Sequence, residues 1–266
     1  MVASYVKANG DHLYKKFQKM VLAVGSKEAD RLKKRYVEFK TLFPKLRQVG
    51  RKELEVLEPK LIEGRDPNVE LLALYSKEGY AIDYGALSKS FVEEAKKTGK
   101  TDVFLNKTVK KIERVKCLYR IITQNGTYQA KVVMVAASAN SLTFAHRLGY
   151  GKEFILLPVA GDFFCSPHLL NGKVYMMQNP KLPFAAIHGD PDVGNPEVTR
   201  FGPIAKVLPV LEKRNYKSFF DFVKLFQFKI SAIASIIKIL SNPTYYKYVA
   251  WNVVYGIPFI GKYAFL

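Results

Sequence analysis

The sequence predicts a mixed α/β protein, of the α/β or α+β type, built from two interleaved parts. An apolar run at 18–25 leads directly into a helix-like segment at 26–43, and several short β-branched runs follow between 102 and 130. Strand-like runs broken by Pro and Gly then occupy 155–203, before a long helical pattern at about 216–240. Strands and helices mixed in this order are typical of these fold classes. With 266 residues, 48% of them hydrophobic, the chain can form one large domain or two modest ones.

The first quarter of the chain predicts a helix, a strand and a second helix. Residues 1–17 have helical spacing, and QKMVLAVG at 18–25 predicts a short apolar strand. We expect Ser26 to cap the next helix, in which apolar residues recur at helical intervals until Pro44 ends it. The stretch RKELEVLEP at 51–59 predicts one or two further helical turns.

The middle of the chain predicts a small meander followed by a buried strand. Short runs rich in β-branched residues fall at 102–105, 108–115, 118–123 and 127–130. QNG at 124–126 predicts a hairpin between the last two runs, because Asn-Gly supplies the positive φ angles of a type I′ turn. KVVMVAAS at 131–138 is apolar with almost no alternation, which predicts a strand covered on both faces. The helix that follows is expected to end at Gly149.

The charge balance is strongly basic. Lys and Arg total 42 against 23 Asp and Glu, a formal net charge of +19 that attracts anions to the surface. A solvated basic surface, acidic membrane lipid and nucleic acid are all compatible with that sign. The densest basic run is RLKKR at 31–35, and there is no long basic block or arginine-rich arm, so nucleic acid is not an expected partner.

The cysteine content and the amino terminus indicate an intracellular protein. Cys117 and Cys165 are the only cysteines and lie far apart, which argues against a disulfide framework, a zinc site or an iron–sulfur cluster. The opening MVASYVKANGDHLYKKF has charges where a secretory signal needs an apolar stretch of roughly 7–15 residues. We therefore expect a cytoplasmic protein, with the inner face of the cytoplasmic membrane as a peripheral location.

One element resembles a known flavoprotein motif. GYAIDYGALSKSFVEEAKKTG contains Gly79, Ile82, Asp83, Tyr84 and Leu87, followed by a helix and a closing glycine. It is similar to the Gly-x-(Ile/Val)-Asp-(Pro/Tyr)-x-x-Leu element of the D-amino-acid-oxidase-like flavoproteins. In those proteins a strand, a meander and an apolar strand ending near the flavin come next, which is the order expected here at 102–138.

Three later segments resemble bacterial malate:quinone oxidoreductases. They are GYGKEFILLPVAGDFF, GKVYMMQNPKLPFAAIHGDPD and TRFGPIAKVLPVLE, and the similarity extends over the first helices and the tail WNVVYGIPFIGKYAFL. The resemblance implies a remnant of an FAD-binding, Rossmann-like domain at 76–150. A mixed-sheet substrate domain with helices would comprise 1–75, including the leading helix, and 151–266, including a long amphipathic helix.

The sequence departs from that family at its cofactor segments. The family opens with a glycine-rich loop whose amides receive the FAD pyrophosphate, and this sequence has no such loop. Gly149-Tyr150-Gly151 ends a helix and has Phe154 where a third glycine belongs. The family also has a later segment that closes over the flavin ring, beyond the point that Leu266 reaches. We therefore expect a fragment for which FAD binding by this chain alone is in doubt.

The resemblance implies a set of site residues. His188, which follows Leu182-Pro183-Phe184, matches a family histidine and would be the catalytic base; a structural role at a strand end is the alternative. Arg200 would bind a substrate carboxylate, unless it is an exposed strand charge. Cofactor contacts would come from Val109, Ala136, Ala137 and Ser138, with Ser138 replacing a glycine of the relatives. HGDPD at 188–192 is expected to form a turn, and no metal site is expected there.

The segment at 219–240 has a narrow polar stripe and three interpretations: packing on the substrate-domain sheet, lying in a membrane interface, or spanning a membrane. Lys229 near its middle disfavours spanning, and packing on the sheet is preferred. Contact with a membrane surface would suit an enzyme that passes electrons to quinone.

Three functional hypotheses follow. The first is an FAD-dependent enzyme that oxidises malate to oxaloacetate, or 2-hydroxyglutarate, and reduces quinone. The second is a truncated or split product that keeps the fold without turnover. The third is a basic module that binds lipid or nucleic acid, with an affinity that falls steeply with salt.

Overall fold

A computed structural model describes residues 2–178 and 186–226, with separate positions at 234, 237, 241–243 and 246. The chain forms two compact units, one of Met1–Thr101 with Gly161–Ile204 and the other of Asp102–Ala160 with Ala205–Leu266. Each unit is built from two separate chain segments, so the predicted mixed α/β architecture with interleaved parts is confirmed. The predicted division at 1–75, 76–150 and 151–266 stays a prediction.

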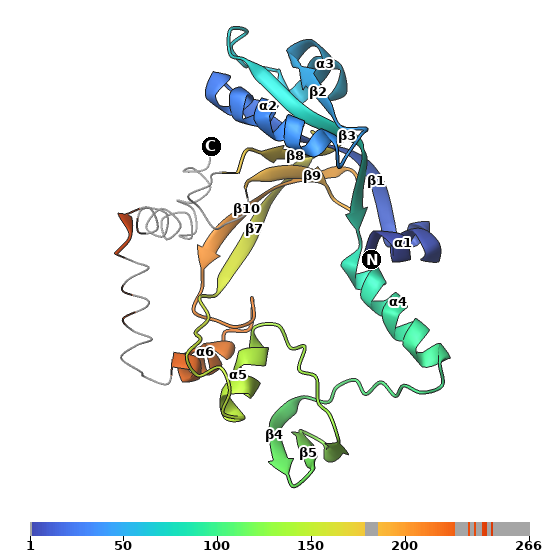
Figure 1. Ribbon diagram of the computed structural model, residues 1–266, viewed down its shortest axis with the longest axis vertical. Coiled ribbons are helices and arrows are strands. Elements are labelled where there is room, and N and C mark those ends of the chain that lie inside the picture. Colours follow the sequence, from blue (N-terminus) through green and yellow to red (C-terminus); the bar gives the residue numbers. More distant parts are fainter. Residues whose placement is uncertain are drawn as a thin grey trace. The chain divides into compact units, whose positions relative to one another are not determined.

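A seven-stranded mixed sheet forms the first unit (Figure 1). Its order is β2-β3-β1-β8-β9-β10-β7. The bounds are β1 Tyr14–Val24, β2 Arg47–Gly50, β3 Leu71–Ile82, β7 Val159–Pro167, β8 Lys173–Met176, β9 His188–Pro191 and β10 Val198–Val207. β1 runs parallel to β8 and antiparallel to β3, while β9 pairs antiparallel with both β8 and β10. The sheet therefore places β1, near the amino terminus, beside β8, which lies about 150 residues later in the chain.

Helices cover both faces of the β1–β3 region. α3 (Arg51–Leu57) buries Leu54 against Met20 and Leu22, whereas α2 (Ser26–Lys40) buries Leu32 against Ala23 and Leu74. Alternate residues of a strand point to opposite faces, so the apolar run of β1 supplies both clusters. The unit also contains α1 (Val2–Asn9), the 3-10 turns η1 (Asp11–Leu13) and η2 (Pro59–Leu61), and α4 (Tyr84–Lys97).

The predictions for the first third of the chain need four corrections. The first helix ends at Asn9, and the strand predicted at 18–25 already begins at Tyr14. Ser26 is not the cap, because Gly25 takes that position with φ 82° and the Glu28 carboxylate accepts from the Val24 amide at 3.0 Å. The strand β3 was not predicted, since Lys77-Glu78-Gly79 interrupts its apolar run.

The flavoprotein-like element occupies the end of β3 and the start of α4. A Cβ at Gly79 would collide with the Phe17 carbonyl oxygen, so this position requires glycine. Asp83 caps α4, because its carboxylate accepts from the Ala86 amide at 2.9 Å. Leu87 is buried in a cluster with residues of α1 and η1. The residues of this element are thus explained by strand contact, helix capping and packing.

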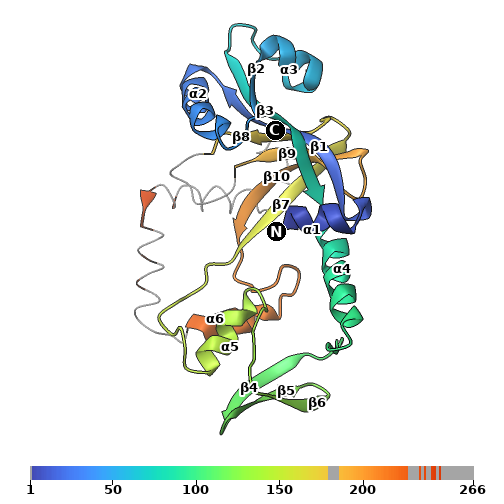
Figure 2. The same ribbon diagram turned by 45° about the vertical axis from the view of Figure 1, so that its right-hand side comes forward.

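The second unit contains a three-stranded antiparallel meander, β4 (Val109–Val115), β5 (Leu118–Thr123) and β6 (Gly126–Ala130), which lie side by side in Figure 2. The hairpin and three of the four runs predicted for the meander are confirmed, whereas the run at 102–105 forms no strand. The predicted turn type is also wrong. Gln124 and Asn125 form the two-residue loop, and the positive φ angle falls on Gly126 instead (φ 145°). A type I′ turn would require positive φ at both loop residues.

The strand predicted at 131–138 is wrong. These residues have no partner strand within the part of the chain that the structure describes, and Val132 and Met134 are 82% and 90% exposed. Exposed and half-buried side chains alternate along the segment, so only one side of it is covered. Apolar composition alone favoured a buried strand, but a strand also needs neighbours that accept its backbone hydrogen bonds.

Two helices pack together in the second unit. α5 (Asn140–Arg147) contributes the half-buried Leu142 to a cluster with Phe222 and Leu225 of α6 (Ser218–Phe226). The rest of the helix predicted to about 240 lies outside the continuous described ranges. No helix within those ranges is both long and apolar enough to span a bilayer.

Glu58 supplies a pH-sensitive contact in the first unit. Its side chain is fully buried, and its carboxylate accepts from the Gln18 side-chain amide at 2.9 Å and the Asn171 backbone amide at 2.8 Å. Burial raises the pKa of Glu58, although these hydrogen bonds oppose the shift. Because the folded protein holds the Glu58 proton more tightly, its stability falls as pH rises above the ordinary glutamate pKa of about 4.3.

We therefore expect Glu58→Gln to lower the free energy of unfolding by about 1–3 kcal/mol at pH 5, because its NH2 group would face backbone and side-chain donors. The deficit should be smaller at pH 8, where the native carboxylate carries its burial penalty. Urea unfolding at both pH values measures the difference, with the exposed Glu55→Gln as a control. A deficit that is equal at the two pH values would contradict the assignment.

Candidate functional site

A hollow of about 570 Å³ in the first unit is lined mainly by polar and charged side chains. Residues of β3, the start of α4 and strands β7 to β10 line it. The lining includes Phe163, Lys173, Tyr175, His188, Asp190, Asp192 and Arg200. The volume lies within the range of about 300–1,000 Å³ that is usual for small-molecule sites.

Asp190 is the centre of an ion-pair cluster. Its side chain is 3% exposed, and Oδ2 lies 3.3 Å from Lys173 Nζ and 3.1 Å from Arg200 Nη2. Arg200 Nε also lies 3.2 Å from Asp192 Oδ2. Arg200 is directly opposite Asp190 in the β9–β10 ladder, so strand register places the pair together. The turn predicted for HGDPD is wrong, because His188–Pro191 form strand β9.

His188 is held in a defined orientation. Its Nδ1 lies 3.1 Å from the Ala186 carbonyl oxygen, which places the proton of the neutral ring on Nδ1 and leaves Nε2 as the acceptor. Tyr175 stacks on the ring with a centroid distance of 4.8 Å, and Phe163 makes an edge contact at 5.7 Å. Nε2 lies 4.0 Å from Asp190 Oδ1, so a proton gained there would face a carboxylate.

The ion-pair cluster is balanced in formal charge, whereas Asp83, which also lines the hollow and caps α4, adds one further negative charge. Lys173 and Arg200 offset Asp190 and Asp192, and the guanidinium of Arg200 also lies 5.5 Å from the Phe163 ring centroid. Burial and the nearby Asp190 charge raise the pKa of Tyr175, so its phenol stays neutral and can donate a hydrogen bond. A third of the Arg200 side chain is exposed, which leaves part of its donor fork open to the hollow.

The structure thus brings His188 and Arg200 into one hollow. Arg200 is not simply an exposed strand charge, because its guanidinium contacts the carboxylates of Asp190 and Asp192. The catalytic role of His188 and the substrate role of Arg200 stay predictions. Lys173 and Asp190 were missed as site residues, because they meet Arg200 only through strand pairing that no local sequence pattern marks.

The predicted cofactor residues lie in the second unit. Val109 begins β4, and Ala136 to Ser138 end the extended segment before α5. Arg147 of α5 donates to the Lys110 carbonyl oxygen at 2.7 Å, so β4 and α5 belong to one packed body. Within the described ranges, no group of three His, Cys, Asp or Glu side chains converges to hold a metal ion.

Comparison with known proteins identifies the family. Residues 1–255 match the family model described as malate:quinone oxidoreductase. The chain belongs to the malate:quinone oxidoreductase family. It is 38% identical over 263 residues to a probable malate:quinone oxidoreductase of Campylobacter jejuni, covering 94% of this chain and 58% of that protein. It is 39% identical over 259 residues to the malate:quinone oxidoreductase of Helicobacter pylori, covering 94% and 57% respectively. The chain therefore spans somewhat over half the length of these curated relatives.

A more distant relative shares part of the sequence, and solved structures share the fold. A mitochondrial L-2-hydroxyglutarate dehydrogenase of Caenorhabditis briggsae is 26% identical over 189 residues, covering 67% of this chain and 42% of that protein. Glycine oxidase from Geobacillus kaustophilus has a TM-score of 0.57 at 16% identity, covering 79% of this chain and 53% of that one. FAD-bound L-α-glycerophosphate oxidase from Mycoplasma pneumoniae has a TM-score of 0.56 at 18% identity, covering 83% and 58%. The predicted kinship of the fold with flavin oxidases is confirmed, and the family implies a flavin cofactor.

We expect Asp190→Asn to lower the free energy of unfolding by about 3–5 kcal/mol, because it leaves Lys173 and Arg200 without their buried counter-charge. Asp192→Asn is the matched control, since its side chain is 28% exposed and should cost about 1 kcal/mol or less. Urea unfolding at neutral pH measures both. Equal losses in the two variants would show that burial of Asp190 does not set the energetics of the cluster.

Ser138 offers a second test, because its φ of 50° is left-handed. Residues with a side chain adopt this conformation at a cost in free energy, whereas glycine does not. Ser138→Gly should raise the free energy of unfolding by about 0.5–1 kcal/mol. Ser138→Ala keeps the side-chain carbon and should leave it nearly unchanged. Thermal and urea unfolding of the three proteins check this. A loss of stability in the glycine variant would contradict the backbone argument.

Proposed function

We propose that this chain carries the substrate-oxidising site of an FAD-dependent oxidoreductase that converts malate to oxaloacetate and passes the electrons to quinone. The observation that carries the proposal is the orientation of His188, whose acceptor Nε2 lies in the same hollow as two cations. Membership of the malate:quinone oxidoreductase family supports the choice of reaction. 2-Hydroxyglutarate, one methylene longer than malate, is the alternative substrate.

The residues of the hollow fit the oxidation of a 2-hydroxy acid. His188 Nε2 would accept the hydroxyl proton, and the resulting imidazolium would face Asp190 Oδ1 at 4.0 Å, which stabilises the charge. Arg200 and Lys173 would hold substrate carboxylates, in exchange for part of their pairing with Asp190 and Asp192. The stacked Tyr175 ring restricts rotation of the imidazole. When bound, the flavin supplies the acceptor for the hydride that leaves the substrate carbon.

The fit of FAD itself is partial. Ala136 and Ser138 are exposed and could border a flat ring, and Ser138 has a left-handed φ of 50°, a conformation that glycine adopts readily. The 266 residues contain no glycine-rich loop to receive the pyrophosphate. We therefore assign Val109 and Ala136 to Ser138 only as contacts to the flavin and derive no step through it.

We also propose a peripheral location on the inner face of the cytoplasmic membrane, since a quinone with an apolar tail dissolves in the bilayer. The net charge of +19 would draw the protein to acidic lipid and raise the local concentration of a dicarboxylate substrate. Nucleic acid is not part of this proposal.

The test is malate-dependent dye reduction by the purified chain supplied with FAD, after checking for flavin absorbance. His188→Gln should lower kcat about 100- to 10,000-fold with little change in KM, because it removes the base while leaving the carboxylate contacts. His168→Gln is the control, since His168 is exposed and bonds to the Pro196 carbonyl oxygen. Protein that gains no flavin absorbance and gives no turnover would favour the inactive, truncated alternative. Full activity in His188→Gln would remove His188 from the mechanism.

A further inference from the structure

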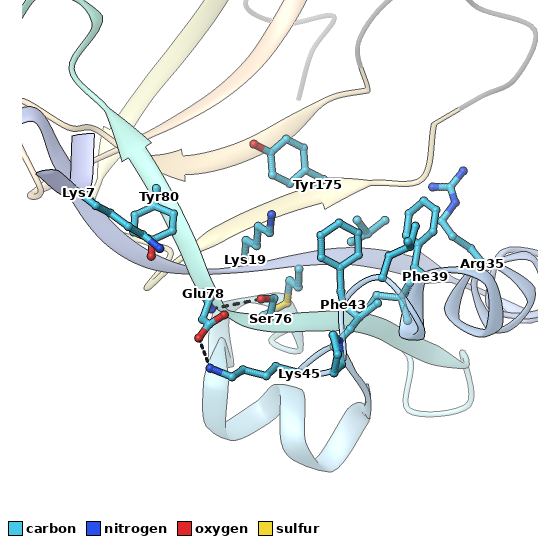
Figure 3. Close-up of a pocket in the computed structure, with 16 residues that line it drawn as sticks. Lys7, Lys19, Arg35, Phe39, Phe43, Lys45, Ser76, Glu78, Tyr80 and Tyr175 are labelled. Atoms are coloured by element: carbon cyan, nitrogen blue, oxygen red, sulfur yellow. Dashed lines mark hydrogen bonds and ion pairs between the residues drawn. The ribbon is translucent and has the colours of Figure 1, made fainter. Parts of the chain in front are cut away.

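A second and larger hollow of about 700 Å³ lies on the α2 side of the mixed sheet. Its floor comes from residues 19–21 of β1, alternate residues of β3 and Tyr175 of β8, and its wall comes from the end of α2 and the loop that follows (Figure 3). Figure 3 shows Lys19, Phe43 and Tyr175 over the same region of the sheet. Leu74, Phe39 and Leu42 add further apolar surface, so the lining is mainly hydrophobic with a few charges.

Of the four cations that line this hollow, only Lys45 has an acidic partner within the described residues. Lys45 pairs with Glu78, and Lys7 lies 5.3 Å above the Tyr80 ring. No carboxylate contacts Lys19 or Arg35 in the described part of the chain, although both line the hollow. Two uncompensated positive charges beside an apolar floor favour a ligand that has an anionic group and an apolar body.

The mouth of the hollow carries exposed apolar side chains within a basic segment. Phe39, Leu42 and Phe43 are 40%, 71% and 57% exposed at the end of α2. Residues 26–47 contain eight Lys or Arg against three Asp or Glu. Exposed aromatic and aliphatic side chains surrounded by cations are typical of surfaces that enter the interface of an acidic bilayer.

We infer that this hollow binds an acidic phospholipid of a membrane. The headgroup phosphate pairs with Lys19 and Arg35, an acyl chain lies on the apolar floor, and Phe39, Leu42 and Phe43 enter the interface. A neutral quinone in the hollow would leave both cations without a counter-charge, and a small dicarboxylate would leave the apolar floor exposed. The inference does not rest on the proposed enzymatic activity.

Vesicle co-sedimentation of the full chain tests this, using phosphatidylcholine with and without 30% phosphatidylglycerol. We expect binding only with the acidic lipid, and weaker binding as salt rises from about 0.1 to 1 M. Lys19→Gln/Arg35→Gln should lower the partition coefficient about 20-fold or more, and Phe43→Ser about ten-fold.

The controls lie on other helices of the same unit. Lys52→Gln/Lys89→Gln removes the same charge from exposed positions of α3 and α4, and Val56→Ser removes an exposed apolar side chain of α3. Circular dichroism melting confirms that every variant is folded. Equal binding to neutral vesicles, wild-type binding by the pocket variants, or equal losses in the controls would each overturn the inference.

A third experiment distinguishes binding of membrane lipid from binding of a free amphiphile. Oleate and a soluble short-chain phosphatidylglycerol are titrated by calorimetry without vesicles. If these bind with the same dependence on Lys19 and Arg35 while vesicles do not sediment the protein, the site takes free amphiphiles and the membrane assignment is wrong. If vesicle binding persists and oleate competes for it, the assignment holds.

Discussion

The buried carboxylate of Asp190 is the constraint on which the candidate site depends. A charge with 3% side-chain exposure requires counter-charges, and here they come from β8 through Lys173 and from β10 through Arg200. The three strands must therefore keep one register for the cluster to form. That register also places Tyr175 opposite His188, so the same ladder fixes both the charge cluster and the imidazole.

Gly189 allows this arrangement on a short strand. His188 and Asp190 are two residues apart and share one face of β9, whereas Gly189 faces the opposite side. A Cβ at Gly189 would collide with Leu170, and would also lie 2.8 Å from a Phe201 ring carbon. Glycine therefore lets Leu170 and Phe201 pack closely against the face of β9 opposite His188 and Asp190.

Local features of the fold were predictable from the sequence, whereas features set by tertiary neighbours were not. The helix after Gly25, the meander and the grouping of His188 with Arg200 followed from periodicity, turn residues and family resemblance. The exposed 131–138 segment, the strand β9 and the role of Asp190 depended on which strands become neighbours. HGDP has the composition of a turn, yet pairing on both sides holds it as a strand. Local composition cannot supply that information.

The two hollows of the first unit differ in whether their cations are paired with carboxylates of the chain. Around Asp190 the cations are neutralised within the chain, so any incoming anion must compete with Asp190 and Asp192 for them, which favours a ligand of matching geometry. Around Lys19 and Arg35 no such competition exists in the described residues, and an anion is attracted by charge alone. Tyr80 and Tyr175 line both hollows. A ligand seated in the larger hollow would therefore lie close to the Tyr175 ring that stacks on His188.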